Sequence, residues 1–394
     1  MDFLKHTIDN GYTDLLSTIN SGVNLLFWEM GTLINNNSGS GSFMRNDLLN
    51  ELSSGLSSVF GDFFNLENLS LIKLFAEKCP VSTIGQISDA INWEYIIHFL
   101  ELEGEKEWLF YMQLIQTDAL DPMGLKKAIL QKAVKHKTID AEKVLSRSDL
   151  KSLYRTSSQL YFNKNELFRK LLEPHSLNDE VIKRFSLQHS TNELVMNIYR
   201  LILEFQSETH YVLNMQFNML MWAIGGSIIR LSTRLNVSVA KCINQCIQEF
   251  GVYFPSLFNK EELSYCIILA EQYKAPNDFR EIAEIVSWPY IKILLEVNSL
   301  KNRYFIAQQV FKSGIDLRDL KNMIIDNSFD FTNISGTSDM ATNHNSTTTE
   351  IINGNNISSI TEVQIEPIVH PLHDLNRNIY KNPELLSFLT NNTY

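Results

Sequence analysis

The stretch Trp93-Glu94-Tyr95-Ile96-Ile97-His98-Phe99-Leu100-Glu101 returns later in the chain as Trp288-Pro289-Tyr290-Ile291-Lys292-Ile293-Leu294-Leu295-Glu296. Tryptophan, tyrosine, isoleucine, leucine and glutamate recur at matching places, at an offset of 195 residues (288 − 93 = 195). Two further pairs of matching segments occur upstream in the same order: WEMG at 28–31 matches WAIG at 222–225, and FG at 60–61 matches FG at 250–251. Such repetition indicates two copies of one structural unit.

Length and composition agree with a two-domain globular protein. The 394 residues allow each copy to bury a core of its own. A hydrophobic fraction of 44% with 20% charged residues is typical of a globular chain. The net charge of −11 argues against a protein that coats polyanions with its whole surface. It leaves room for a local basic face, because binding follows the distribution of charge.

Apolar residues recur with helical spacing through both copies. Between Leu15 and Ile34 they lie three and four residues apart, which predicts an amphipathic helix with one buried face. Ser88-Asp89 is predicted to cap a helix over residues 91–102, and Asp121-Pro122 to open the last helix of the copy. No strand-like alternation occurs before residue 331. The predicted fold is therefore all-α, with at most one small hairpin of the winged-helix kind.

Shifts in composition set the predicted boundaries. Residues 331–370 are dominated by asparagine, serine and threonine without a period, and such a segment buries too little apolar surface to offset its ordering entropy. The predicted parts are a first helical copy (12–137), a charged helical bridge (138–193), a second helical copy (194–330), a disordered polar linker (331–370) and a hinge-like tail (371–394).

Residues 211–229 carry no charge and are long enough to cross a bilayer. Asn214 and Asn218 would be costly in lipid, and the matching helix of the first copy carries Glu29. We therefore predict a buried core helix and no contact with a membrane. The first residues lack an apolar secretory core, which predicts a cytoplasmic protein.

The four cysteines show no metal-binding spacing. Cys242 and Cys246 lie one helical turn apart, but no nearby histidine completes a site. Buried thiols, no metal and no cofactor are the prediction. Gly225-Gly226 stands inside a helical pattern, which favours close packing over a phosphate-binding loop.

Several segments resemble the helical N-terminal domain of YhcG-like PD-(D/E)XK nucleases. LSSGLSSVFG at 52–61 and NLSLIKLFAEKCP at 68–80 match consecutive parts of the family pattern, with Lys73 at an arginine position of the family. In the second copy RYF at 303–305 and GIDLRDL at 314–320 match its end. YKNPELLSFL at 380–389 is similar to the hinge that leads into the nuclease domain of the family. The resemblance implies a nucleic-acid-associated protein whose nuclease domain is missing.

The residues themselves show no nuclease site either. That chemistry needs carboxylates on adjacent strands to hold Mg²⁺, with a lysine beside the attacking water. Asp149-Leu150-Lys151 and Asp319-Leu320-Lys321 fit the tripeptide, but both stand in helical patterns, which predicts surface charge. We predict that the chain is not an enzyme.

Two functions remain open. The first is a non-catalytic nucleic-acid-binding or adaptor protein, of a mobile-element or defence system. The second copy has thirteen basic against fourteen acidic residues and the first has nine against fifteen, so nucleic acid, DNA foremost, should bind the second copy. A separate nuclease subunit and a second copy of this chain are further candidate partners. The predicted contacts are Arg230, Arg234, Lys241, Lys292, Lys301, Arg303 and, in the first copy, Lys73.

The alternative is a protein–protein interaction scaffold without nucleic-acid binding. In this hypothesis the acidic first copy docks a partner, and the aromatic segment 60–64 is a candidate contact. Salt-dependent retention on DNA separates the two functions.

Overall fold

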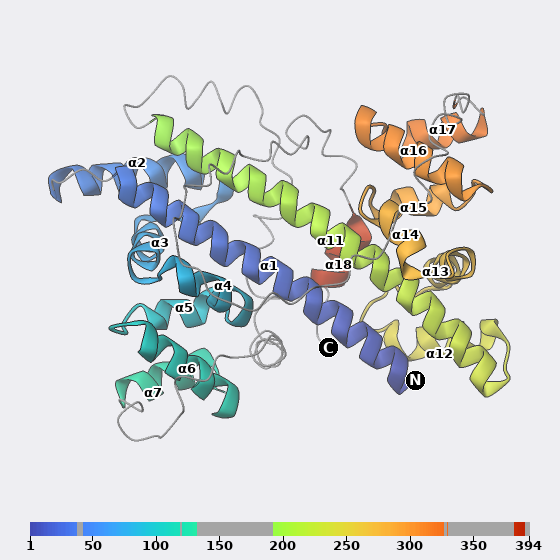
Figure 1. The fold of residues 1–394 in the computed structure, drawn as a ribbon, viewed down its shortest axis with the longest axis horizontal. Coiled ribbons are helices and arrows are strands. Elements are labelled where there is room, and N and C mark those ends of the chain that lie inside the picture. The colour runs from blue at the N-terminus through green and yellow to red at the C-terminus, as the bar shows by residue number, and fades with distance from the viewer. Residues whose placement is uncertain (38–41, 119, 132–191, 327–328, 330–381, 391–394) are drawn as a thin grey trace, which may run out of the picture.

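The structure is a computed structural model that describes residues 1–37, 42–118, 120–131, 192–326, 329 and 382–390 (Figure 1). Within these ranges every regular element is a helix, so the all-α prediction is confirmed and the small hairpin is not found there. The predicted bridge and polar linker fall almost wholly outside the described residues.

The first copy consists of seven α-helices and one short 3₁₀ turn. They are α1 (Asp2–Asn37), α2 (Ser42–Phe60), η1 (Asp62–Phe64), α3 (Leu66–Lys78), α4 (Val81–Ala90), α5 (Trp93–Phe99), α6 (Glu105–Asp118) and α7 (Pro122–Leu130). Asp121 caps α7 as predicted, by accepting a hydrogen bond from Gly124 N–H. The cap predicted at Ser88-Asp89 is wrong, because Ser88 lies within α4 and Asn92 caps α5.

The second copy repeats the α-helices in the same order. They are α11 (Asn192–Leu235), α12 (Val239–Phe250), α13 (Lys260–Gln272), α14 (Pro276–Ala283), α15 (Trp288–Leu294), α16 (Leu300–Ser313) and α17 (Leu317–Ile325). Helices α11 to α17 therefore correspond one by one to α1 to α7. A further helix, α18 (Pro383–Thr390), ends the described chain.

Side-chain hydrogen bonds to backbone carbonyls recur in both copies, which shows that the repeat extends to atomic detail. Each pair joins equivalent helices: Trp28 Nε1 to the Cys79 carbonyl (2.9 Å) and Trp222 Nε1 to the Tyr273 carbonyl (2.8 Å); Asn24 Nδ2 to the Ile91 carbonyl (2.7 Å) and Asn218 Nδ2 to the Val286 carbonyl (2.8 Å); Tyr95 Oη to the Leu120 carbonyl (2.9 Å) and Tyr290 Oη to the Ile315 carbonyl (3.0 Å).

Two glycines at equivalent places let the long helices approach their neighbours closely. A Cβ built at Gly31 would lie 2.3 Å from the Ile72 carbonyl oxygen on α3. A Cβ at Gly225 would lie 1.9 Å from the Cys266 carbonyl oxygen on α13. The close packing predicted for Gly225-Gly226 is therefore confirmed at Gly225, whereas a Cβ at Gly226 would meet only the end of the Arg230 side chain, at 3.9 Å.

The long helices α1 and α11 pack side by side in opposite directions through the middle of the molecule (Figure 1). A Cβ at Gly11 would touch the Leu220 side chain, and one at Gly22 would touch Phe205, so rising numbers on α1 meet falling numbers on α11. Helices α2 to α7 lie at one side of this pair and α12 to α17 at the other. The two copies thus share a common helical centre.

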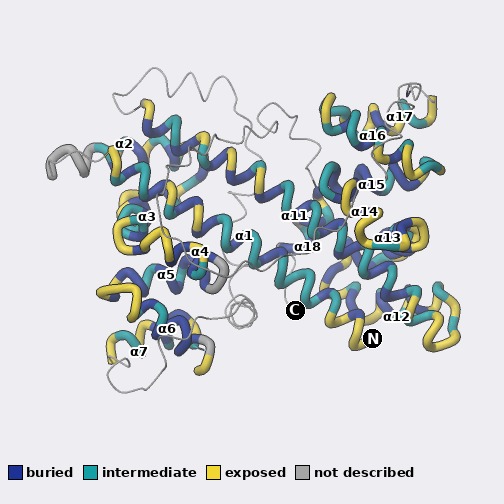
Figure 2. Tube along the Cα trace, viewed as in Figure 1, coloured by how far each residue is buried: buried dark blue, intermediate teal, exposed yellow. Residues whose placement is uncertain are grey.

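The tryptophans of the repeat motif occupy equivalent buried places. Trp93 is 4% exposed and Trp288 is fully buried, whereas Trp28 and Trp222 are half-buried. Buried residues follow the inner faces of the helices, and exposed residues lie on their outer turns (Figure 2). The candidate aromatic contact at 60–64 belongs largely to this core, because Phe60 and Phe64 are buried.

Helix α11 is long and apolar enough to cross a membrane by length and composition. In this fold it packs against α1, α13 and α14, which makes it a core helix as predicted. Its partner α1 carries Glu29, which is exposed at the surface of the helix. Partial burial raises the pKa of Glu29, and the carboxylates of Glu208 and Glu204 on α11 raise it further.

Candidate nucleic-acid interface

One end of the second copy gathers three of the predicted basic residues. Arg230 and Arg234 lie one turn apart in the last part of α11, and Lys241 lies in the first turn of α12. All three are exposed. They are the only charged residues between Glu208 and Glu249, so this helix–turn–helix end has positive charge without an acidic residue of its own.

The turn between α11 and α12 has a defined structure. Asn236 adopts a left-handed backbone conformation with φ 52°, which asparagine tolerates better than most residues. Ser232 Oγ donates to the Val237 carbonyl at 2.7 Å. Ser238 caps α12 by accepting a hydrogen bond from Lys241 N–H at 3.3 Å. These contacts fix the direction in which α12 leaves α11, and hence the position of Lys241 relative to the two arginines.

The start of α1 lies against this end and encloses a pocket of about 330 Å³ with it. The lining is largely apolar and comes from the first turn of α1 and the last turns of α11: Met1, Asp2, Phe3, Leu4, Ser227, Arg230, Leu231, Arg234 and Leu235. The Arg230 guanidinium lies 5.1 Å from the centre of the Phe3 ring and donates to Ser227 Oγ at 3.3 Å. The guanidinium groups of Arg230 and Arg234 therefore border an apolar pocket, and Asp2 is the acidic residue in its lining.

The other predicted basic residues of the second copy lie elsewhere and differ in exposure. Lys301 is exposed at the start of α16. Arg303, two residues later, is only 2% exposed; its Nε donates to the Val297 carbonyl at 2.6 Å and its Nη2 to the Leu295 carbonyl at 3.2 Å. Arg303 is therefore held by two backbone carbonyls of the core, which argues against its use as a phosphate contact; that contact stays a prediction.

Lys292 is also committed to the protein interior. Its Nζ lies 2.7 Å from Glu262 Oε1 on α13 and 2.8 Å from Glu384 Oε1 on α18. Burial lowers the pKa of Lys292, but the two carboxylates outweigh this effect and leave the pKa above its ordinary value. Trp288 Nε1 donates to the second oxygen of Glu262 at 2.7 Å, which completes a partly buried network. The two carboxylates thus hold Lys292 within the protein, which argues against its use in nucleic-acid binding; that contact stays a prediction.

In the first copy, Lys73 lies on α3 and forms an ion pair with Glu77, one helical turn later. It is half-buried and belongs to the part of the molecule built around α2 to α7. Lys73 is therefore separate from the basic end of the second copy.

The repeat in the sequence indicates that Lys292 and Arg303 occupy inward-facing positions. At the offset of 195, Arg303 corresponds to Trp108 and Lys292 to Ile97. Trp108 is 2% exposed and Ile97 is half-buried, so the matching positions face inward in the first copy. By contrast Arg230 matches Asn36 at the offset of 194, a polar residue on an exposed turn.

The remaining candidates for chemistry that the structure describes have structural surroundings, whereas Asp149 and Lys151 lie outside the described residues. All four cysteines are free and buried, as predicted. Burial raises the pKa of Cys79 and of Cys246 to about 12, so these thiols stay protonated at neutral pH. Among the described residues no group of histidine, cysteine and carboxylate side chains could hold a metal ion. Asp319 and Lys321 are exposed on α17, a helix, as their pattern predicted.

Comparison with known families gives one match, in two places. The model described as the DUF1016 N-terminal domain matches residues 3–136 and residues 197–330. No curated protein and no solved structure matches significantly. The two matches cover the two sets of seven helices, and the first begins close to the start of α1 instead of at residue 12. Because the matches span more than half of its length, the chain belongs to the DUF1016 N-terminal domain family, the YhcG-like family, and carries that domain twice.

Proposed function

We propose that this protein binds nucleic acid without cleaving it, through the basic end of the second copy formed by Arg230, Arg234 and Lys241. The observation that carries the proposal is the charge pattern: these three exposed cations are the only charges in the stretch from 209 to 248. Phosphate contacts supply most of the affinity of non-specific nucleic-acid binding, and they need clustered lysine and arginine.

The difference between the copies supports the same assignment. Both copies have the same helix order and equivalent side-chain hydrogen bonds, so a difference in their surface charge need not reflect a difference in fold. The second copy has arginines at 230 and 234 where the first has Asn36 and Ser40. A basic end that only one of two equivalent scaffolds possesses suits a chain in which one copy contacts the ligand. An adaptor role in a mobile-element or defence system is part of this proposal.

Fluorescence anisotropy with labelled single-stranded DNA, duplex DNA and RNA tests the proposal across a salt series. On duplex DNA the logarithm of the association constant should fall against that of salt with a slope of about −0.9 for each phosphate neutralised. A triple variant with glutamine at positions 230, 234 and 241 should bind at least about tenfold more weakly and with a shallower slope.

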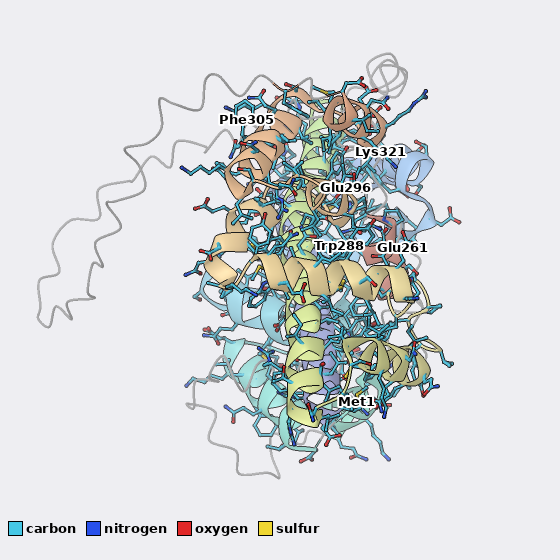
Figure 3. All side chains as sticks on the ribbon, turned by 90° about the vertical axis from the view of Figure 1, so that its right-hand side faces the viewer. Met1, Glu261, Trp288, Glu296, Phe305 and Lys321 are labelled. Carbon is cyan, nitrogen blue, oxygen red and sulfur yellow. The ribbon has the colours of Figure 1, made fainter. Side chains whose placement is uncertain are left out.

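A matched control removes three charges at the opposite end of the second copy. Lys312, Arg318 and Lys321 are all exposed on α16 and α17, and Figure 3 shows Lys321 far from Met1, which lines the pocket. Glutamine at these three positions changes the net charge by the same amount and should leave binding nearly unchanged. Equal losses in both triple variants would show that only total charge matters and would overturn the proposal.

The second candidate function is a protein–protein interaction scaffold. The observation that favours it is the groove of the second copy that holds α18, because a groove that takes up a helix is a common mode of peptide recognition. Wild-type protein with no salt-dependent binding to any of the three nucleic acids would favour this function.

A further inference from the structure

Helix α18 docks where the two copies meet. Its apolar residues Leu385, Phe388 and Leu389 are buried. The Phe388 ring lies among aromatic rings from both copies: 5.4 Å from Tyr12 on α1, 6.0 Å from Phe217 on α11 and 4.9 Å from Phe254 after α12. A single side chain therefore contacts the first copy and the second at once.

Polar contacts fix the direction and register of α18. Asn382 caps the helix by accepting from Leu385 N–H at 3.0 Å, and its Nδ2 donates to Asn214 Oδ1 on α11 at 2.8 Å. Asn382 is only 3% exposed, so this pair is part of the core. Farther along, the Ser387 hydroxyl meets the Ser256 hydroxyl at 2.7 Å.

The acidic residue of α18 completes the network around Lys292. Glu384 Oε1 lies 2.8 Å from Lys292 Nζ, and Lys292 in turn contacts Glu262. Without Glu384 the lysine would keep one of its two carboxylates. The groove thus binds one acidic residue near the start of the helix, Glu384, and one aromatic residue a turn later, Phe388.

Two of the side chains of the second copy that contact α18 have no counterpart of the same kind in the first copy. By the repeat offsets, Lys292 corresponds to Ile97, Phe217 to Val23 and Asn214 to Asn20. Asn20 Nδ2 is already bound to the carbonyls of Ser88 and Ile91, at 3.0 and 2.8 Å. The first copy therefore lacks the cation and the phenylalanine that receive α18, although it keeps an asparagine at position 20.

Helix α18 is too short to be stable by itself. An isolated helix of eight residues is not stable in water, so α18 owes its structure to the surface on which it docks. Residues 330–381 separate α18 from the second copy along the sequence, which means that chain proximity alone does not place it.

We propose that this groove is a docking site for a short amphipathic helix, and that the chain fills it in cis with its own segment 382–390. The tail then acts as an exchangeable clasp that joins the first copy to the second. Because cis docking benefits from a high effective concentration, a peptide of the same sequence reaches the groove only when the tail is weakened or outcompeted.

The test uses the full chain and a fluorescent peptide of residues 380–394. The wild-type chain should bind this peptide weakly, because its groove is filled. The full chain with Phe388→Ala should bind it at least about tenfold more tightly. Circular dichroism and the thermal midpoint show whether this variant remains folded.

Changes in the peptide test the chemistry of the groove without affecting the protein. A Phe388→Ala peptide should lose measurable binding to the tail-weakened chain, and a Glu384→Gln peptide should bind about tenfold more weakly. Pro383 is exposed, so a Pro383→Ala peptide serves as the control and should bind within about twofold of the parent. A folded Phe388→Ala chain that binds no peptide would overturn the proposal, as would equal binding of parent and Phe388→Ala peptides.

Hydrogen exchange on the wild-type chain gives an independent result if the Phe388→Ala variant does not fold. Excess parent peptide should accelerate amide exchange in residues 383–390 while leaving α11 and α13 unchanged, because the peptide displaces the tail alone. Unchanged exchange in this segment at saturating peptide would show that the tail is a fixed part of the fold.

Discussion

Gly225 offers the sharpest test of the packing between the long helices and their neighbours. In Gly225→Ala the new methyl carbon would lie 1.9 Å from the Cys266 carbonyl oxygen and 2.4 Å from its carbon, both in the backbone of α13. No side-chain rotation relieves this overlap, so α11 and α13 must separate. Overpacking of this kind costs about 1–3 kcal/mol, and the higher helix propensity of alanine returns only about 1 kcal/mol.

The neighbouring glycine supplies the control. In Gly226→Ala the methyl carbon would meet only the flexible end of Arg230, at 3.9 Å, so the variant gains helix propensity without a clash. Urea unfolding should place Gly226→Ala about 0.5–1 kcal/mol above the wild type in stability and Gly225→Ala up to about 2 kcal/mol below it. If both variants were stabilised alike, the close approach of α11 and α13 would be refuted.

Three further predictions concern polar side chains whose surroundings the structure defines. Trp288→Phe should destabilise the protein by about 1.5–3 kcal/mol more than Trp93→Phe in urea unfolding, because only Trp288 donates to a carboxylate; equal losses would contradict this. Glu29→Gln should raise the thermal midpoint at neutral pH. The raised pKa of Glu29 means that its charged form disfavours folding. The gain in stability should therefore be full above the pKa of Glu29 in the folded protein and vanish below its pKa in the unfolded chain. A gain that does not change with pH would contradict this prediction. Arg303→Gln should cost about 1–3 kcal/mol, seen as a lower urea midpoint, through the carbonyls it leaves without a donor; an unchanged midpoint with weakened nucleic-acid binding would restore Arg303 to the interface.

The sequence predicted the features that depend on local pattern. Helical spacing and the repeat of the tryptophan motif were enough to predict the all-α fold and the two copies. The cap at Asp121 and the close packing at Gly225 could also be predicted, because each has a local chemical signature.

Features that depend on distant contacts were not accessible in this way. The first turns of α1 carry a weak pattern, yet Leu4 and Ile8 are buried there, on a helix that packs along α11 of the other copy. Charge alone likewise does not reveal that Lys292 and Arg303 have partners inside the protein. Such partners come from helices far away in the sequence, so only the tertiary structure identifies them.

The shared helical centre has a consequence for folding during synthesis. Helix α1 is made long before α11, which begins at residue 192 and covers it, so the first copy leaves the ribosome with one face of α1 exposed. Contacts between such distant segments slow folding and leave apolar surface open to association in the meantime. Although it has two domains by sequence, the protein should therefore complete its first domain only after the second has begun to emerge.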